Sequence, residues 1–439
     1  SLNLKDRFEL GRVQIALGEN FKPKIIASDV TIYDNPNRRP FLEISKVELG
    51  LSLGQLYRGK FDLATISLDG LMLGVKRDSK GDYSVKFGPS STLTEAGENS
   101  LFPVSTIFKN LLEKDVFLTL KNLTITSMTM QYDDQKASKL WVVDGVRMEL
   151  TRELDDISVR GDAAFLMGGA DISTLQINYK TNLSSGDGSL GILFNDFPSR
   201  EIAAQAPALS WLNVVEAPIS GAFRTKLGSD REIREISASL KIGSGVLRAD
   251  AKSRPLHFDN ASVYFSYDRK INVLSFEEIN INSADLKTSL VGSAQFKIDQ
   301  DERSFYAGTL RAKELEINPL ELYDKPLEFE DVEIDFVLEP EPFNLEVQHL
   351  SIKDPLRDLV VRAKGQIVSG KSGWEVSSEL ESDKAENNDI IAYWPPDFKK
   401  NGRLWLEKNV LDANLKDLYA SVTFGSNIRP KVVMGYSFS

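Results

Sequence analysis

Strict alternation of apolar and polar residues limits the fold of this chain more than any other feature. Every second residue is apolar from Val47 to Leu53 and from Val332 to Leu338. Because successive side chains of a strand point to opposite faces, each stretch predicts a strand with one apolar face. The pattern recurs at Ile66–Leu68, Leu71–Val75, Leu118–Leu120, Met128–Tyr132, Val263–Tyr267 and Phe343–Val347. The chain is therefore expected to be mainly β.

The segments between these strands predict how the strands connect. Short turn sequences at Asp34–Asn37, Asp78–Asp82, Ser184–Gly188 and Ser369–Gly373 favour tight reversals, and hence a largely antiparallel sheet. Helical spacing of apolar residues predicts only a few short capping α-helices, at Pro103–Val116, Pro207–Val215 and Asn388–Trp394.

The length of 439 residues exceeds one compact core unless the sheet is repetitive and elongated along an axis. A soft repeat, in which a short strand with an aspartate precedes a longer alternating strand, occurs at Asp29–Asp34 and at Leu123–Asp134. Phe276–Ile281 likewise resembles Leu327–Val332. We expect two segments, residues 1–210 and 211–439, with a soft boundary near Ala206–Gly221 inside one continuous superstructure.

Composition excludes several classes of function. The formal net charge of −11 and the absence of a strong basic cluster argue against nucleic acid as a partner. The chain has no cysteine, so thiolate metal sites, cysteine nucleophiles and disulfides are excluded.

The sequence predicts no catalytic residue, no metal site and no cofactor. His257 and His349 each stand alone, without a second ligand at helical or hairpin spacing. Carboxylate pairs such as Asp133-Asp134 fall in turns or at strand ends, where solvated acidic residues are common. The glycine clusters lack the strand-to-helix context of phosphate loops. We therefore expect a protein that is not an enzyme.

One-sided strands stacked side by side form an apolar wall that a second sheet, a helix or a ligand must cover. From the residues alone, a closed core of a structural or assembly protein is as good an interpretation as a groove that binds lipid. The residues predicted to line the wall are Val47, Leu49, Leu51, Leu53, Ile66, Leu68, Leu120, Met128, Met130, Val263, Phe265, Tyr267, Val332, Ile334, Phe336, Leu338, Leu345 and Val347.

Several stretches resemble the AsmA-like envelope proteins, in particular their YhdP branch. They are Ala217–Gly221 followed by Phe223 and the Leu240–Arg248 strand, the opening Ile26–Asp34 with Ile44–Leu53 and Leu71–Asp82, and the helix at Pro103–Val116 before Leu123–Asp133. The most specific likeness is Tyr393-Trp394-Pro395 followed by Arg403-Leu404-Trp405-Leu406. The resemblance covers most of the chain.

The resemblance implies a fold and a function. The sheet would be bent into a gutter whose apolar groove carries the acyl chains of phospholipid between the inner and outer membranes. The location would be the periplasm of a Gram-negative bacterium, with an inner-membrane anchor on the amino-terminal side of residue 1. Outer-membrane or other envelope proteins would be partners. The alternative is an envelope scaffold with a closed β core and no lipid cargo.

Overall fold

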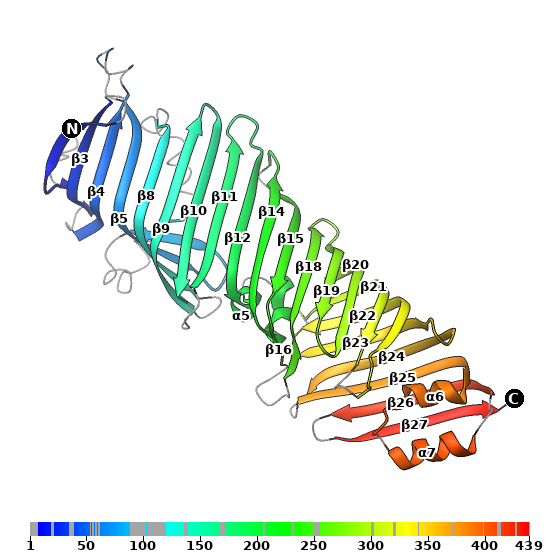
Figure 1. The fold of residues 1–439 in the computed structure, drawn as a ribbon. Coiled ribbons are helices and arrows are strands. Elements are labelled where there is room, and N and C mark those ends of the chain that lie inside the picture. Colours follow the sequence, from blue (N-terminus) through cyan, green and yellow to red (C-terminus); the bar gives the residue numbers. More distant parts are fainter. Residues whose placement is uncertain are drawn as a thin grey trace. The chain divides into compact units, whose positions relative to one another are not determined.

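The computed structural model describes residues 8–18, 22–34, 39–52, 54, 57, 59, 62–87, 102–103, 120–135, 139–166, 172–204, 207–230, 232–248, 255–299, 303–318, 322–340, 342–370, 373–397, 399–410, 414–425 and 428–438. Most of these residues are in strands, and the helices are short (Figure 1). The predicted fold class, mainly β and largely antiparallel with few short helices, is confirmed. The chain divides into two compact units, residues 1–196 with 224–233 (unit 1) and residues 197–223 with 234–439 (unit 2).

The sheet of unit 1 follows the order β3–β4–β5–β8–β9–β10–β11–β12, with β1 and β2 both paired to β3 and with β6 and β7 continuing from β5. Its strands are β1 (Phe8–Glu9), β2 (Val13–Leu17), β3 (Pro23–Asp34), β4 (Arg39–Leu51), β5 (Leu63–Arg77), β6 (Tyr83–Phe87), β7 (Phe102–Pro103), β8 (Asn122–Asp134), β9 (Lys139–Glu153), β10 (Asp156–Leu166), β11 (Ile172–Asn182) and β12 (Gly188–Pro198).

One pair in this sheet, β5 with β8, is parallel, whereas the other ladders are antiparallel. Parallel neighbours need a long connection. Residues 78–121 provide it and include β6 and β7. Apolar and polar residues alternate in the same way in parallel and antiparallel strands, so the sequence did not predict the parallel pairing of β5 with β8.

Unit 2 contains an antiparallel sheet in the order β15–β18–β19–β20–β21–β22–β23–β24–β25–β26–β27. The direction of its strands turns progressively from β18 to β27, as twisted strands require (Figure 1). These strands are β15 (Ile233–Ile242), β18 (Asn260–Asp268), β19 (Val273–Asn282), β20 (Leu286–Ile298), β21 (Ser304–Ile317), β22 (Leu327–Pro340), β23 (Phe343–Asp354), β24 (Leu359–Gly370), β25 (Gly373–Glu386), β26 (Asn414–Gly425) and β27 (Ile428–Phe438).

The remaining elements are small. A three-stranded sheet contains β13 (Val215–Glu216), β16 (Gly245–Leu247) and β17 (Leu256–Phe258), and β14 spans Pro218–Leu227. The helices are α5 (Ser199–Ala203), the 3-10 helix η4 (Pro207–Val214), α6 (Asn387–Tyr393) and α7 (Lys400–Asn409).

The predicted helices have different outcomes. α6 confirms the helix expected at Asn388–Trp394, which ends before Pro395-Pro396 because proline cannot continue a helix. The helix expected at Pro207–Val215 is a 3-10 helix over Pro207–Val214 and not an α-helix. The helix expected at Pro103–Val116 lies outside the described residues except for Pro103, which is in β7. α5 and α7 were not predicted.

The soft repeat coincides with residues in the left-handed region. Asp29, Ser127 and Asp331 have φ values of 52°, 51° and 48°, and the strand register shifts at Ser127 and Asp331. In β22 the pairing with β23 shifts between Glu330 and Glu333. The extra residue changes the phase of alternation, so Phe329 and Val332, three positions apart, are both buried.

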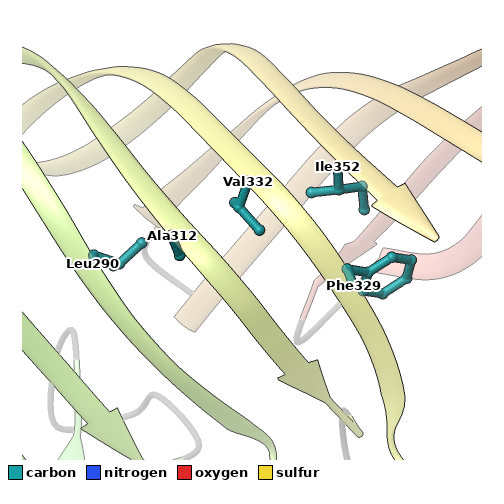
Figure 2. Close-up of a cluster of buried hydrophobic side chains, with 5 residues drawn as sticks. All are labelled: Leu290, Ala312, Phe329, Val332 and Ile352. Atoms are coloured by element: carbon teal, nitrogen blue, oxygen red, sulfur yellow. The ribbon is translucent and has the colours of Figure 1, made fainter. Parts of the chain in front are cut away.

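A buried cluster of unit 2 lies under this bulge. Leu290, Ala312, Phe329, Val332 and Ile352 come from the neighbouring strands β20 to β23 (Figure 2). They lie side by side because register pairs Leu290 with Ala312 and Ala312 with Val332. Each of the five side chains is buried.

Candidate functional site: the apolar faces of the two units

The apolar side of the unit 2 sheet is continuous across its strands. Residues directly opposite each other in antiparallel strands share a face. Ile334 of β22 lies opposite Leu310 on one side and Leu350 on the other, and Phe336 lies opposite Val347. Beyond β23, Leu350 lies opposite Ala363. Apolar residues are thus matched from strand to strand.

We call this surface the unit 2 apolar face. Register places on it, among others, Ala238, Leu240, Val263, Phe265, Tyr267, Leu274, Phe276, Ile279, Leu290, Ala294, Tyr306, Leu310, Ala312, Phe329, Val332, Ile334, Phe336, Leu338, Leu345, Val347, Leu350, Ile367, Val376, Leu380, Val422, Phe424, Val432 and Met434.

The opposite face of the same strands is polar and charged. Its side chains form ion pairs between neighbouring strands, including Arg311 with Glu333 at 2.6 Å and Lys364 with Glu379 at 2.8 Å. These pairs are solvent-exposed, so they contribute little to stability. Their role is to keep one side of the sheet in water, which leaves the apolar face as the side that needs a cover.

Helix α6 covers one part of the unit 2 apolar face. The ring of Tyr393 is stacked on Phe329, with centroids 6.2 Å apart and planes at 11°. Ile390 of the same helix is buried. Tyr393 also accepts a hydrogen bond at its carbonyl oxygen from the Tyr323 hydroxyl, at 2.7 Å. The buried cluster is therefore closed by this helix.

A polar group holds α6 in place, and we call it the Asp354 cluster: Asp354, Arg357, Asp389 and Tyr393. The Tyr393 hydroxyl donates to Asp354, and Arg357 Nη1 lies 2.6 Å from Asp354 Oδ2. Burial opposes ionisation of Asp354, but the hydrogen bonds from Tyr393 and Arg357 outweigh it and lower its pKa. Burial, together with the bond to Asp354, raises the pKa of Tyr393. The carboxylate is thus satisfied inside an apolar environment.

Other parts of the unit 2 apolar face are incompletely covered. Ile334, Phe336, Leu345 and Val347 are partly exposed although they lie in the middle of long strands. On β26 and β27 the exposure is larger, 45% for Phe424, 46% for Val432 and 39% for Met434. Residues of a closed core are normally buried. This part of the face is therefore available to a further apolar group.

Unit 1 has an apolar face of the same kind. Its members include Ile25, Val30, Ile44, Val47, Leu49, Ile66, Leu68, Leu71, Leu123, Ile125, Met128, Met130, Val143, Val146, Leu150, Val159, Leu175, Ile177, Ile192 and Phe194. Ile177 is 37% exposed on this face. The pattern of one apolar and one polar side is thus common to both units.

A buried ion pair interrupts the unit 1 apolar face at the ends of β5 and β8. Arg77 Nη1 lies 3.3 Å from Asp134 Oδ2, and the Tyr132 hydroxyl donates to the same oxygen at 3.2 Å. Arg77 is also 5.7 Å from the centre of the Tyr83 ring. Breaking a buried pair leaves an uncompensated charge, which costs about 3–5 kcal/mol. We interpret the pair as a device that fixes the register of the parallel strands.

The residues predicted to line the apolar wall have definite positions. Val47, Leu49, Ile66, Leu68, Met128 and Met130 are on the unit 1 apolar face, and Leu51 ends β4 opposite Leu63. Val263, Phe265, Tyr267, Val332, Ile334, Phe336, Leu338, Leu345 and Val347 are on the unit 2 apolar face. Leu120 is buried just before β8, and Leu53 lies outside the described residues.

Sequence reasoning missed the polar groups that accompany these faces, and the expectation that Asp134 is solvated was wrong, because its side chain is fully buried. Asp354 and Tyr393 are 39 positions apart in sequence, and Arg77 and Asp134 are 57 apart. No local motif marks either pair. The aspartate–arginine turn Asp354–Arg357 was the only nearby signal, and it is indistinguishable from an ordinary turn.

The described residues contain no constellation for chemistry that we can identify. His257 lies opposite Val246 in the small sheet, and His349 lies opposite Asp335 on the polar side of β22 and β23. No group of three histidines or acidic residues within the described ranges could hold a metal ion. A shallow cleft of unit 1 is lined by residues such as Thr151, Ser158, Lys180 and Lys226, and its described lining contains no histidine that could serve as a base.

Comparison with known proteins finds no match: no family model, no curated protein and no solved structure is significantly similar to the chain. Across the part of the chain that the structure describes, none of the helices combines the length and apolar character needed to cross a bilayer.

Proposed function

We propose that the chain binds lipid acyl chains along the apolar faces of its two units and acts as a lipid conduit without catalysis. The observation that carries the proposal is the unit 2 apolar face. Strand register places apolar residues of neighbouring strands opposite each other from β15 to β27, yet the face is only partly covered. An acyl chain is an apolar, unbranched group of adaptable length. Such a group fits a long face better than a compact apolar ligand does.

The energetics favour an acyl ligand on this face. Each CH2 group that leaves water contributes about 0.8 kcal/mol when fully buried. A tail lying across Ile334, Phe336 and Val347 would cover apolar surface that is now partly exposed. Because the opposite side of the sheet is charged, the tail has one face on which to lie. Movement along that face exchanges one apolar contact for another, and so requires no reaction.

The resemblance to the AsmA-like envelope proteins extends the proposal to the cargo and the place. It supports phospholipid as the lipid, the periplasm as the compartment and the inner and outer membranes as the two ends of the route. The rival function is a scaffold with a closed core and no cargo. The two functions differ in whether lipid contacts the side chains of the apolar face.

A photocrosslinking experiment separates the two. The chain has no cysteine, so a single introduced cysteine carries a benzophenone label at one position only. We would compare Phe336→Cys with Val337→Cys, because these neighbours are both partly exposed but lie on opposite faces of β22. After irradiation in a Gram-negative host, mass spectrometry should find phospholipid attached at position 336 and much less at position 337.

The outcome is decisive in both directions. Equal labelling at the two positions would mean that lipid contact is not specific to the apolar face. No lipid at either position, with an organic extract of the purified protein also free of lipid, would reject the conduit and favour the scaffold.

A further inference from the structure

Helix α7 exposes its apolar side chains to solvent. It spans Lys400–Asn409, and none of its residues is buried. Trp405 is 60% exposed and Leu404 is 37% exposed. A tryptophan normally buries a large part of its ring in a folded protein. The exposed Trp405 and Leu404 therefore indicate a surface that binds another molecule.

The local sequence gives α7 little stability of its own. Its N-cap, Lys399, has a left-handed φ of 47° and makes no side-chain capping hydrogen bond, and the first turn contains no acidic residue. Gly402 lies in the first turn of the helix, and glycine is the weakest helix former after proline. A ten-residue helix is marginal in water without packing. Binding to an external surface would supply the missing stabilisation.

The charge around the exposed pair differs from that of the whole chain. The chain has a net charge of −11, but residues 399–409 contain four cations and one acidic residue, Glu407. Lys399, Lys400 and Lys408 are exposed, and the single acidic residue, Glu407, lies 3.9 Å from Arg403. A locally basic helix with exposed tryptophan and leucine is complementary to an anionic membrane surface.

We infer that α7 docks unit 2 on the anionic headgroup surface of a lipid bilayer. Trp405 and Leu404 enter the headgroup region, and Lys400 and Lys408 contact lipid phosphates. The start of α7 lies close to the end of α6, because a side chain added at Gly402 would come within 3.6 Å of the ring of Trp394, the C-cap of α6. Docking therefore holds a membrane close to the helix that covers the unit 2 apolar face.

Vesicle flotation of the full chain tests this inference. The probes are vesicles of phosphatidylcholine alone and vesicles of phosphatidylcholine mixed with phosphatidylglycerol. We expect binding to the anionic vesicles, and strong weakening at ~1 M salt, where the screening length is about 3 Å. Lys400→Glu with Lys408→Glu should weaken binding by roughly 30-fold, about fivefold per lysine lost. Trp405→Ala should weaken it by about tenfold.

Matched variants control for charge and for exposed apolar surface. Lys297→Glu with Lys313→Glu makes the same change of charge at exposed positions of β20 and β21, and Leu356→Ala removes a side chain that is 80% exposed in a turn. Both controls should bind anionic vesicles as the unaltered chain does. Thermal melting of every variant should be unchanged, because all altered side chains are exposed.

Three results would overturn the inference. They are no binding of the unaltered chain to either vesicle, equal loss in the controls and in the α7 variants, and no loss in the α7 variants. The inference does not depend on the conduit. Crosslinking of lipid at position 336 would persist in the α7 variants if only docking were wrong, and vesicle binding would persist without crosslinking if only the conduit were wrong.

Discussion

A single charge placed on the unit 2 apolar face should stop lipid from passing while leaving the sheet folded. The perturbation is Phe336→Asp, in the middle of β22. Phe336 is partly exposed, so its replacement removes part of an aromatic contact and should cost about 1–2 kcal/mol in the free energy of unfolding. The new carboxylate stays hydrated on an incompletely covered face, which avoids the cost of a buried charge.

The effect on lipid should be much larger than the effect on stability. An acyl chain that crosses position 336 must displace the water around the carboxylate, at a penalty of several kcal/mol. A penalty of about 3 kcal/mol corresponds to a more than hundredfold loss of occupancy. Val332→Asp provides the contrast on the same strand. Val332 is 2% exposed beneath α6, so a carboxylate there should unfold unit 2.

The assay combines thermal melting with crosslinking at a distant position of the same face. A benzophenone-labelled cysteine at Val376 of β25 lies three strands from Phe336. Phe336→Asp should keep a cooperative melt but abolish lipid crosslinking at position 376, and Phe336→Ala should reduce it only slightly. A folded Phe336→Asp variant with full crosslinking would show that lipid does not pass this residue. Unfolding as severe as that of Val332→Asp would show that the face is a closed core.

Three further predictions concern the structures that support the apolar face. Phe329→Ala should lower the free energy of unfolding of unit 2 by about 3–5 kcal/mol, measured by urea denaturation, because the ring is buried and stacked on Tyr393. The pKa of Asp354 is lowered in the folded state. Its contribution to stability is therefore present above the unfolded pKa of 3.8 and is lost as the pH falls through the lower folded pKa. Asp354→Asn should lose less stability between neutral and acidic pH than the unaltered chain does. Asp331→Gly should be tolerated at the bulge, whereas Asp331→Val should cost about 1–2 kcal/mol because a branched residue is strained at a φ of 48°; equal urea midpoints for the two variants would contradict this account of the bulge.

Period-two alternation predicted the strands in which it is uninterrupted, and the apolar side of those strands. The face of a side chain depends only on its position within a strand, so Ile334 and Phe336 could be assigned together from their spacing. The end of α6 was also predictable, because Pro395-Pro396 forbids its continuation. These features depend on residues that are close in sequence.

Features that depend on contacts distant in sequence could not be predicted. The parallel pairing of β5 with β8 and the ion pair between Arg77 and Asp134 depend on which strands become neighbours. Helix α7 was missed for a different reason. Its sequence contains a glycine and two asparagines and lacks a buried apolar stripe, so the pattern that identifies ordinary helices is absent.

The partial cover of the unit 2 apolar face links these observations to function. α6 closes the face where Phe329, Val332 and Ile352 form a buried cluster, and the Asp354 cluster holds the helix there. Phe336, Val347 and Phe424 remain accessible on the same side. A scaffold would gain stability by covering these residues as well, because each partly exposed side chain lacks a share of the roughly 1.5–3 kcal/mol that full burial contributes. Retaining them at that cost is consistent with a face whose cover is a ligand, which is the step that crosslinking at Phe336 tests.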